Sequence, residues 1–378
     1  MVKDVIKLGD VATYINGYAF KPEDRGEVGL PIIRIQDLTG NAYDLGFYDG
    51  EYPEKIEIND GDVLISWSAS LGVYVWNRGR ALLNQHIFKV VFDKVDIDKN
   101  YFVYAVRQKL VEMGMKTHGA TMKHIVKKDF DATLIPYPSL IEQAEIATNL
   151  NKVSRVIEAR KQELQLLDDL IKARFVELFG DPVIHLDKGE TVKLDTIADK
   201  ITVGFVGEAS NEYVDEGVPY LRTQNVRVNR IDLNGLIYVS ESFHNKNQKS
   251  IIHPGDVVIS RVGVNRGMAA MVPDSLQEAN IANCLIVGKT ENINPYYLAF
   301  YMNMSFGKRP QFGASVGSAQ GVVNTSILKK WEVYVPDRHM QDDFFEFAKQ
   351  VDKSKVVVQK ALDNTQVLFD SLMQKYFG

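Results

Sequence analysis

The chain has 378 residues, of which 45% are hydrophobic and 25% charged, and its formal net charge is −5. This length predicts two or three domains with a core each, and the composition is typical of a soluble globular protein. No apolar run of about 18 residues is present, and the first residues lack the layout of a signal peptide, so we expect no membrane span. Because the chain is not a polycation, binding to nucleic acid would require basic groups gathered on one surface.

Cys284 is the single cysteine of the chain. It excludes an internal disulfide framework and fits a reducing compartment, so the cytoplasm is the expected location. Because Cys284 lies in the apolar run Ile281–Val287, we expect it to be a small buried residue. The seven histidines show no paired spacing suited to a metal ion, so no metal site is predicted.

The stretch 138–181 is predicted to form one long helix with marked ends. Ser139 and Glu142 have the spacing of a capping box, and Gly180 followed by Pro182 is a helix stop. Between these ends, apolar residues recur every seven residues, with companions at d-type positions, which is typical of a coiled-coil seam. The predicted seam consists of Leu150, Val153, Ile157, Leu164, Leu167, Ile171 and Leu178, with Arg160 and Arg174 as polar interruptions.

Ordered matches between the two halves of the chain indicate a tandem duplication. Leu30–Gln36 matches Val218–Gln224 at an offset of 188 residues, and Asp60–Ser66 matches Pro254–Ser260 at an offset of 194. From Pro138 onward the offset stays at 198, so the insertions collect in the globular parts, where loops tend to carry binding residues. The predicted divisions are a first globular domain (1–137), a central helix (138–180), a second globular domain (181–335) and a C-terminal helix (336–378).

Each globular domain is predicted to mix α and β structure. Short β-branched or aromatic runs bounded by turn residues predict strands, and one run with helical spacing in each domain predicts a helix. The predicted strands are Leu30–Gln36, Val63–Trp67, Leu71–Trp76 and Ile87–Phe92 in the first domain, and Val218–Arg222, Val257–Arg261 and Ile281–Val287 in the second. The predicted helices are Tyr101–Met113 and Tyr296–Met304.

A second long helix is predicted from about Pro336 to Phe377, with Asp337 as its N-cap. Two helices joined through a folded domain can lie antiparallel, and about 35 helical residues would span roughly 50 Å. We therefore expect an α+β fold: two mixed α/β globular domains separated by two long antiparallel, coiled-coil-like helices, as a tandem repeat with pseudo-two-fold symmetry. The seam of the second helix is predicted to contain Val351, Val358, Leu362, Phe369, Leu372 and Tyr376, with Lys355 and Thr365 as polar positions.

This doubled order resembles the specificity (S) subunit of a Type I restriction–modification system. The resemblance covers nearly the full length and is carried by Pro-x-x-x-x-Gln at Pro138 and Pro336, by the Gly-Asp-Val-(Leu/Val)-Ile-Ser strands and by the Phe-Gly helix ends. It implies a non-catalytic subunit in which each target-recognition domain reads one half of a bipartite, asymmetric site in double-stranded DNA. The helices would set the spacer and dock two methyltransferase (modification) subunits. S-adenosylmethionine, ATP and Mg would belong to those subunits and to a restriction (translocase) subunit, with no cofactor in this chain.

The residues agree that the chemistry of such a complex lies in other chains. No lysine is preceded two residues earlier by Asp or Glu, so the PD-(D/E)xK nuclease signature is absent. No Asn-Pro-Pro-Tyr tetrapeptide of an amino-methyltransferase is present either. The alternative function is a duplicated two-domain scaffold that binds protein or glycan partners, with the helices as its spacer.

Three places in the first domain are predicted to contact DNA, because their residue types read base edges or bind phosphates. These residues are Arg34 and Gln36 after a strand, Ser66, Trp67, Ser68 and Ser70 in a polar turn, and Thr117, His118, Thr121, Lys123 and His124 in a basic loop. The alternative for Arg34 and Gln36 is a fold-stabilising pair, because both recur in the second domain. The alternative for Trp67 is a place in the core, and for the basic loop a solvated connection.

The corresponding DNA-contacting residues of the second domain are Arg222, Gln224, Arg261, Asn265, Arg266, Lys308, Arg309, Ser318 and Gln320. Arg261 and Arg266 lie in the turn that aligns with 66–70, which contains no arginine, so the two half-sites are predicted to differ and the whole site to be non-palindromic. Residues 1–137 carry 17 basic against 19 acidic groups, and residues 181–335 carry 15 against 16. We therefore expect weak DNA binding by the chain alone and stronger binding with the methyltransferase subunits.

Overall fold

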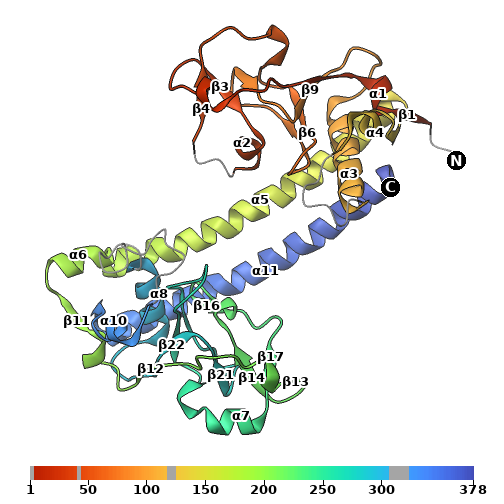
Figure 1. Ribbon diagram of the computed structural model, residues 1–378. Helices are drawn as coiled ribbons and strands as arrows, with labels where there is room; N and C mark the ends of the chain where they lie inside the picture. The colour runs from red at the N-terminus through yellow and green to blue at the C-terminus, as the bar shows by residue number, and fades with distance from the viewer. Residues whose placement is uncertain (1–3, 41–43, 117–124, 306–322) are drawn as a thin grey trace. The chain divides into compact units, whose positions relative to one another are not determined.

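The computed structural model describes residues 4–40, 44–116, 125–305 and 323–378. The chain divides into two units, the first formed by Met1–Gln162 with Gln359–Gly378 and the second by Glu163–Val358. Two long helices, α5 (Leu140–Phe179) and α11 (Arg338–Phe377), therefore each contribute one half to either unit (Figure 1). Each unit consists of one globular domain and one half of the helix pair.

The first unit contains two four-stranded sheets, ordered β2-β9-β6-β7 and β4-β3-β8-β5, and the pair β1-β10. Its strands are β1 (Val5–Lys7), β2 (Thr13–Asn16), β3 (Leu30–Ile33), β4 (Gly46–Tyr48), β5 (Glu57–Ile58), β6 (Val63–Ser66), β7 (Gly72–Val75), β8 (Ala81–Leu83), β9 (Ile87–Val91) and β10 (Leu134–Pro136). Its shorter helices are α1 (Leu8–Val11), α2 (Ile35–Thr39), α3 (Lys99–Lys116) and α4 (Lys127–Asp131).

The second unit contains a four-stranded sheet ordered β12-β22-β19-β20, a five-stranded sheet ordered β13-β17-β14-β21-β18, and the pairs β11-β23 and β15-β16. Its strands are β11 (Thr191–Lys193), β12 (Ile201–Val203), β13 (Tyr213–Val214), β14 (Val218–Leu221), β15 (Val226–Arg227), β16 (Arg230–Ile231), β17 (Ile237–Val239), β18 (Ile251–Ile252), β19 (Val257–Ser260), β20 (Ala269–Met271), β21 (Ala279–Ile281), β22 (Cys284–Val287) and β23 (Glu332–Tyr334). Its shorter helices are α6 (Pro182–Asp187), α7 (Glu241–Lys246), α8 (Pro295–Ser305) and α10 (Thr325–Lys329).

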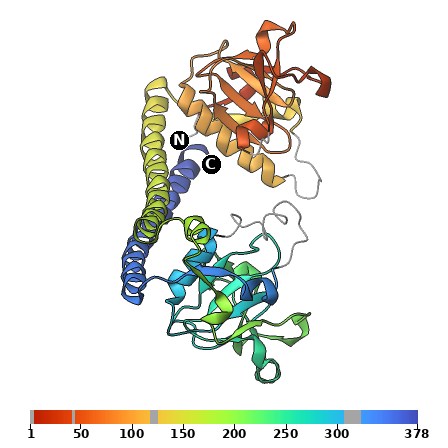
Figure 2. The ribbon, with the colours of Figure 1, turned by 90° about the vertical axis from the view of Figure 1, so that its left-hand side faces the viewer.

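The two units repeat one hydrogen-bonded plan, as the sequence duplication predicted. Val63 of β6 lies opposite Val90 of β9, and Val257 of β19 lies opposite Val287 of β22. In both units one parallel pair interrupts the otherwise antiparallel strands, β3 with β8 and β14 with β21. A helix lies against the first sheet in each case, α3 beside β7 and α8 beside β19 and β20 (Figure 2).

Both long helices complete the core of the first unit. Leu150, from the first half of α5, is fully buried in a cluster with Tyr101 of α3 and with Met373 and Phe377 from the end of α11. The beginning of α5 thus lies beside the end of α11, which makes the two helices antiparallel in this unit. The aromatic residue of the Phe-Gly ending is part of the core as well as a marker of the helix end.

The second unit contains the complementary halves of the same helices. Phe175 of α5 stacks on Tyr297 of α8 with ring centroids 5.6 Å apart, and it meets Phe344 of α11 edge-on at 5.4 Å. Lys355 of α11 forms an ion pair with Asp168 of α5 at 2.6 Å. Burial by itself lowers the pKa of Lys355, but the hydrogen bonds and charges of Asp168 and of the neighbouring carboxylate raise it overall. The antiparallel pairing and the α+β class are therefore confirmed.

A buried glutamine ties the start of each long helix to its domain. The side-chain amide N–H of Gln143, which is 1% exposed, donates to the carbonyl of Pro138 at 2.8 Å, and its oxygen accepts from the backbone N–H of Asp98 at 2.9 Å. These contacts give the Pro-x-x-x-x-Gln motif a physical reason, because a buried amide must have partners for its donor and its acceptor. The second unit repeats them with Gln341, Pro336 and Asn294.

The predicted ends of the first long helix are confirmed. Ser139 and Glu142 form the capping box, with the Glu142 N–H donating to Ser139 Oγ at 3.4 Å and the Ser139 N–H donating to Glu142 Oε2 at 3.1 Å. Gly180 follows the helix with a φ of 72°, which is the left-handed conformation of a C′ glycine.

The predicted strands extend past the observed ones by one residue at one or both ends, except for two that differ more. Leu30–Gln36 ends as a strand at Ile33, because Arg34 already caps the short helix α2. Ile281–Val287 is divided between β21 and β22, which belong to different sheets. The chain turns at Asn283, whose φ of 51° is one that asparagine adopts more readily than a β-branched residue.

Chemical labelling of Cys284 tests whether the core of the second unit is packed around this side chain. Its side chain is fully buried, and burial raises the pKa of the thiol, so the reactive thiolate is both shielded and disfavoured. We expect an aromatic disulfide reagent at pH 8 to label the folded chain at least about 100-fold more slowly than the chain in denaturant, because labelling must await opening of the core. The control is the variant Ser371→Cys, whose added thiol would stand at an exposed position of α11. Equal labelling rates for both thiols in the folded variant would contradict the burial of Cys284.

Candidate nucleic-acid interface

Several loops of the first sheet lie together at one end of its strands, because neighbouring strands are antiparallel. The ends of β2 and β6 meet the beginnings of β7 and β9 there, and we call the loops 16–18, 67–71 and 84–86 the first edge. The N–H of Trp67 donates to the carbonyl of His86 at 3.2 Å, and the N–H of Gln85 donates to the carbonyl of Tyr18 at 2.8 Å. Ile125, in the described end of the predicted basic loop 117–128, donates its N–H to the carbonyl of Trp67 at 3.0 Å. The polar turn and the described end of the basic loop therefore meet at this edge.

The second domain builds its edge with equivalent hydrogen bonds, and we call the loops 204–206, 261–267 and 282–283 the second edge. The N–H of Arg261 donates to the carbonyl of Asn283 at 3.3 Å, and the N–H of Asn283 donates to the carbonyl of Phe205 at 2.9 Å. Val323 donates its N–H to the carbonyl of Arg261 at 3.2 Å. Arg261 thus occupies the backbone position that Trp67 occupies in the first domain.

Most of the predicted DNA-contacting side chains in the polar turn of the first edge are buried or bonded to other residues of the domain. Trp67 stacks on Phe88 at 5.5 Å and donates its indole N–H to the amide oxygen of Asn16 at 3.3 Å. Ser66 is fully buried and donates its hydroxyl to the carbonyl of Ser70. Ser68 is also buried, at 5% exposure. Only Ser70 among the predicted residues of this turn is exposed to solvent.

Tyr18 and Gln85 are exposed side chains of the first edge that the sequence analysis did not select. Tyr18 is 46% exposed and meets Phe20 edge-on, with ring centroids 5.0 Å apart. Tyr18 follows β2 in the connection to β3, and Gln85 lies in the short connection between β8 and β9. Their only signal in the sequence is that position, which many uninvolved loop residues share.

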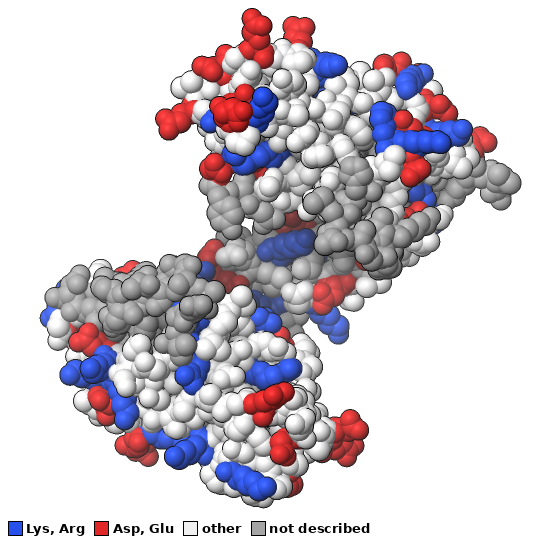
Figure 3. Space-filling view, in the orientation of Figure 1, with Lys and Arg blue, Asp and Glu red and all other residues white. Residues whose placement is uncertain are grey.

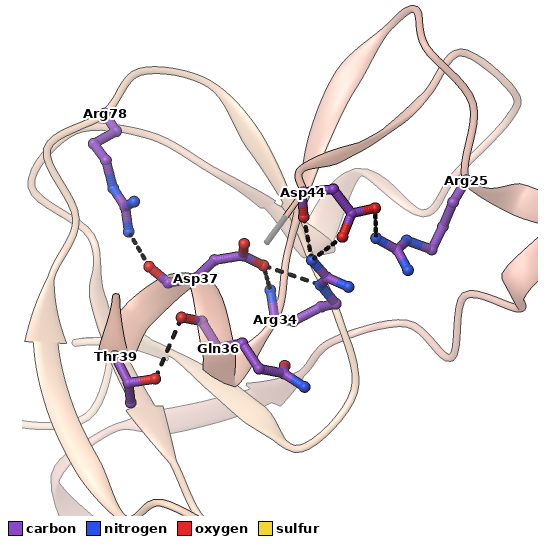
Figure 4. Close-up of polar contacts among 7 residues, drawn as sticks. All are labelled: Arg25, Arg34, Gln36, Asp37, Thr39, Asp44 and Arg78. Carbon is purple, nitrogen blue, oxygen red and sulfur yellow. Dashed lines mark hydrogen bonds and ion pairs between the residues drawn. The ribbon is translucent and has the colours of Figure 1, made fainter. Parts of the chain in front are cut away.

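Arg34 is held by two carboxylates of its own domain (Figure 4). Its Nε donates to Asp37 Oδ2 at 3.1 Å, and its terminal nitrogen lies 3.7 Å from Asp44 Oδ1. The side chain of Asp37 is fully buried, so this pair supports the loop that follows β3. Gln36 is exposed, and its amide points away from the pair (Figure 4). The contacts of Arg34 match the fold-stabilising alternative, whereas the side chain of Gln36 is open to solvent.

The predicted residues of the second edge differ in what they contact. Asn265 is 6% exposed and donates its amide N–H groups to the carbonyls of Thr223 at 3.1 Å and Val226 at 3.2 Å, which anchors the turn 261–267. Gln224 is exposed, as Gln36 is. Arg266 is half-buried in the same turn.

Arg222 and Arg261 have a different environment from Arg34. Each has a buried Nε with no hydrogen-bond acceptor among the residues that the structure describes. A buried donor without a partner costs about 1–3 kcal/mol, and more when the group is charged. Arg261 of the second edge and Arg222 next to it thus each have a buried Nε without an acceptor among the described residues.

The remaining predicted DNA contacts lie outside the described residues. They are Thr117, His118, Thr121, Lys123, His124, Lys308, Arg309, Ser318 and Gln320. Their loops rejoin the described chain at Ile125 and Val323, each of which is hydrogen-bonded to an edge.

The predicted helix seam is buried or half-buried throughout. Leu150, Ile157, Ile171 and Val351 are buried. The seven-residue period missed Phe175, Phe344 and Met373, which contact the globular domains as well as the opposite helix. A coiled-coil pattern describes contacts between helices, so it gives no signal for helix residues that face a domain.

The surface charge is mixed. On the face shown in Figure 3, basic and acidic side chains are interspersed over both domains.

Among the described residues, no group of three His, Cys, Asp or Glu side chains is placed to hold a metal ion. No helix in the described ranges combines the length and the apolar character that crossing a membrane requires.

Two solved structures share this fold. A Type I restriction–modification system S subunit from M. genitalium matches with a TM-score of 0.56 and 16% identity, over 99% of this chain and 96% of that one. A chain from a study of complex assembly and conformational transition of the type I R-M system matches with a TM-score of 0.53 and 14% identity, over 100% of this chain and 98% of that one.

Sequence comparison identifies the family. The chain is 24% identical to the Type I restriction enzyme EcoBI specificity subunit of Escherichia coli, over 98% of this chain and 85% of that protein. It is 22% identical to the Type I restriction enzyme MjaVIII specificity subunit of Methanocaldococcus jannaschii, over 95% of this chain and 89% of that protein. The family model described as Type I restriction modification DNA specificity domain matches residues 3–168 and 187–365, which include both globular domains and most of both helices. The chain therefore belongs to the family of Type I restriction–modification specificity subunits, as its doubled sequence pattern predicted.

Proposed function

We propose that this chain is the non-catalytic DNA-reading subunit of a Type I restriction–modification complex, and that each domain reads one half of a bipartite, asymmetric DNA site. The observation that carries the proposal is the pair of edges. Equivalent backbone hydrogen bonds hold Trp67 in one domain and Arg261 in the other. A shared scaffold with different side chains at equivalent positions suits two readers of different base sequences.

The proposed DNA contacts come from the edges and the segments next to them. In the first domain Gln36 and Ser70 are exposed and carry the polar groups that read base edges. In the second domain Gln224, Arg261 and Arg266 have the corresponding roles. The predicted loop residues outside the described ranges belong to the same proposal. Trp67 and Asn265 would instead position these loops, because their side chains are bonded within the fold.

The two long helices would set the spacer between the half-sites and dock two methyltransferase subunits. Exposed apolar side chains on the helices support docking, because a bound partner would remove their apolar surface from water. In the second unit they include Leu166 (68% exposed), Val356 (68%) and Val357 (69%). S-adenosylmethionine, ATP and Mg would be bound by the methyltransferase and restriction subunits, in the cytoplasm.

Sequencing of methylated adenines in cells with and without this gene tests the proposed function. We expect one bipartite motif with two different halves to be methylated only when the gene is present, because the chain would direct the methyltransferases to it. Deletion of the methyltransferase gene is the matched control and should remove the same motif. An unchanged methylation pattern would contradict the DNA-reading role, and a perfect palindrome would contradict the asymmetry of the domains.

The variants Arg261→Ala and Arg266→Ala test the assignment of the second half-site. We expect each to relax discrimination in the second half-site only, by about 1–3 kcal/mol for each lost bidentate contact with a base. The measurement is binding of the assembled complex to duplexes with single substitutions in either half. Gln36→Ala is the matched control and should affect only the first half-site. Equal losses in both halves for the arginine variants would show that the assignment is wrong.

Insertion of four residues in both helices, after Gln162 and after Val358, tests the spacer. One added helical turn lengthens each helix by about 6 Å. At about 3.4 Å for each base pair, we expect the methylated motif to gain about two base pairs of spacer while both half-sites stay the same. Insertion in α5 alone is the control and should destroy activity, because it shifts the paired helices out of register. A change in the bases recognised would contradict the separation of reading from spacing.

A further inference from the structure

Arg34 and Arg222 occupy the same position in the two domains. Each follows the strand that pairs with a parallel neighbour, β3 in the first domain and β14 in the second. Ile32 lies opposite Gly46, and Tyr220 lies opposite Ile237. Each arginine is thus two residues beyond an equivalent pair, which allows their surroundings to be compared directly.

The two carboxylates that hold Arg34 have uncharged counterparts in the second domain. Asp37, three residues after Arg34, corresponds to Asn225, three residues after Arg222. Asp44, two residues before Gly46, corresponds to Gly235, two residues before Ile237. Asn225 keeps the structural part of the contact, because its Oδ1 accepts the N–H of Arg222 at 2.9 Å. It brings no negative charge to the guanidinium.

Arg222 and Arg261 are both held next to the short segment 282–283 of the second edge. Leu221, next to Arg222, accepts the N–H of Ala282 at 2.9 Å, and Arg261 donates its N–H to the adjacent Asn283. The Asn265 amide also joins the turn 261–267 to the carbonyl of Thr223. The backbone therefore brings the two arginines to one place.

The surroundings of Tyr220 and Cys284 agree with this placement. Burial raises the pKa of Tyr220 to about 12, and the charge of Arg222 opposes that rise. Burial also raises the pKa of the Cys284 thiol, and the charge of Arg261 opposes that rise. The charge of an ionised Cys284 would also raise the pKa of Tyr220, which is consistent with these two buried side chains lying near each other.

Among the described residues, neither guanidinium has a carboxylate partner, and each has a buried Nε without an acceptor. A guanidinium that is partly removed from water and not neutralised attracts an acceptor more strongly than a solvated one. Its planar set of donors suits a group with two acceptors side by side. In DNA, such groups are the O6/N7 edge of guanine and the phosphate oxygens.

We propose that Arg222 and Arg261 form a two-arginine receptor for a paired-acceptor group of the second half-site, and that Asn225 keeps this receptor open. In the first domain Asp37 and Asp44 bind Arg34, the equivalent of Arg222. Trp67 stands there at the position of Arg261. Asn225 and Asp37 are thus positioning residues that decide whether the arginine after the parallel strand is available to DNA. This inference rests on the proposed DNA-reading function.

The test uses the full complex with its methyltransferase subunits and duplexes that carry the methylated motif. Asn225→Asp adds the carboxylate that the first domain has, and Arg222→Met removes the charge while it keeps an unbranched side chain. We expect either variant to weaken binding about 10- to 100-fold, with the loss of discrimination confined to the second half-site. Asp37→Asn with Asp44→Asn is the reciprocal variant. It should strengthen binding and steepen the dependence of log K on log salt by about one.

Replacement of the guanines of the second half-site by 7-deazaguanine separates the two sources of acceptors, because it removes N7. If guanine is the ligand, the replacement weakens the wild type and leaves Arg222→Met unaffected. If phosphate is the ligand, the replacement has no effect, and Arg222→Met lowers the salt dependence by about one. Weakened binding with neither signature would mean that Arg222 has a structural role only and would overturn the inference.

Thermal unfolding of each complex separates loss of binding from loss of fold. The Asn225 amide also donates to the carbonyl of Asp232 at 3.0 Å, so Asn225→Asp can disturb the loop, whereas Arg222→Met keeps that contact. Binding by Arg222→Met within twofold of the wild type would overturn the inference while the proposed function stands. Absence of any methylated motif would contradict the proposed function itself.

Discussion

Burial of the apolar stripes of the two long helices is the constraint on which both domains depend. A helix with such a stripe is not stable alone in water, and each globular domain lacks part of its core without the helices. Phe175 and Phe179 complete the core of the second unit, and Met373 and Phe377 complete that of the first. Each buried side chain of this size contributes about 1.5–3 kcal/mol. The Gln143 and Gln341 contacts fix where each long helix starts, so each helix is attached to the domain that precedes it in the sequence.

The loops of the two edges can vary while this attachment is kept. The loops of both edges are held by backbone hydrogen bonds, such as those of Trp67 with His86 and Arg261 with Asn283, which do not depend on side-chain identity. Side chains at the same backbone position can therefore change from an indole to a guanidinium without a change of fold. In the proposed function, recognition would use side-chain atoms of residues whose backbone atoms hold the fold, which would suit a family whose members read different DNA sequences.

The same polar residue types serve both structure and surface, and this limits what a loop sequence reveals. The charge of Arg34 predicted a DNA contact, but in the structure Arg34 forms ion pairs with Asp37 and Asp44. The amide of Asn265 likewise predicted a DNA contact, but in the structure it donates hydrogen bonds to two backbone carbonyl groups. Buried polar groups need partners, so a polar residue in a loop is often occupied before any ligand arrives. Arg34 and Arg222 occupy equivalent positions, and the contacts show that Asp37 and Asp44 hold the first, whereas Asn225 and Gly235 bring no charge to the second.

The sequence by itself determined the duplication, the two long helices with their caps and seam, and the family, because these features repeat over tens of residues and have strong local signals. It also predicted the strands at the centre of the sheets, where apolar runs are continuous. Only the tertiary structure decided that Ile281–Val287 turns at Asn283, that Phe175 faces a domain, and which arginines have partners. The physical reason is that a side chain's partner comes from segments distant in the chain. Asp44 and Asn283 become neighbours of Arg34 and Arg261 only when the strands pair.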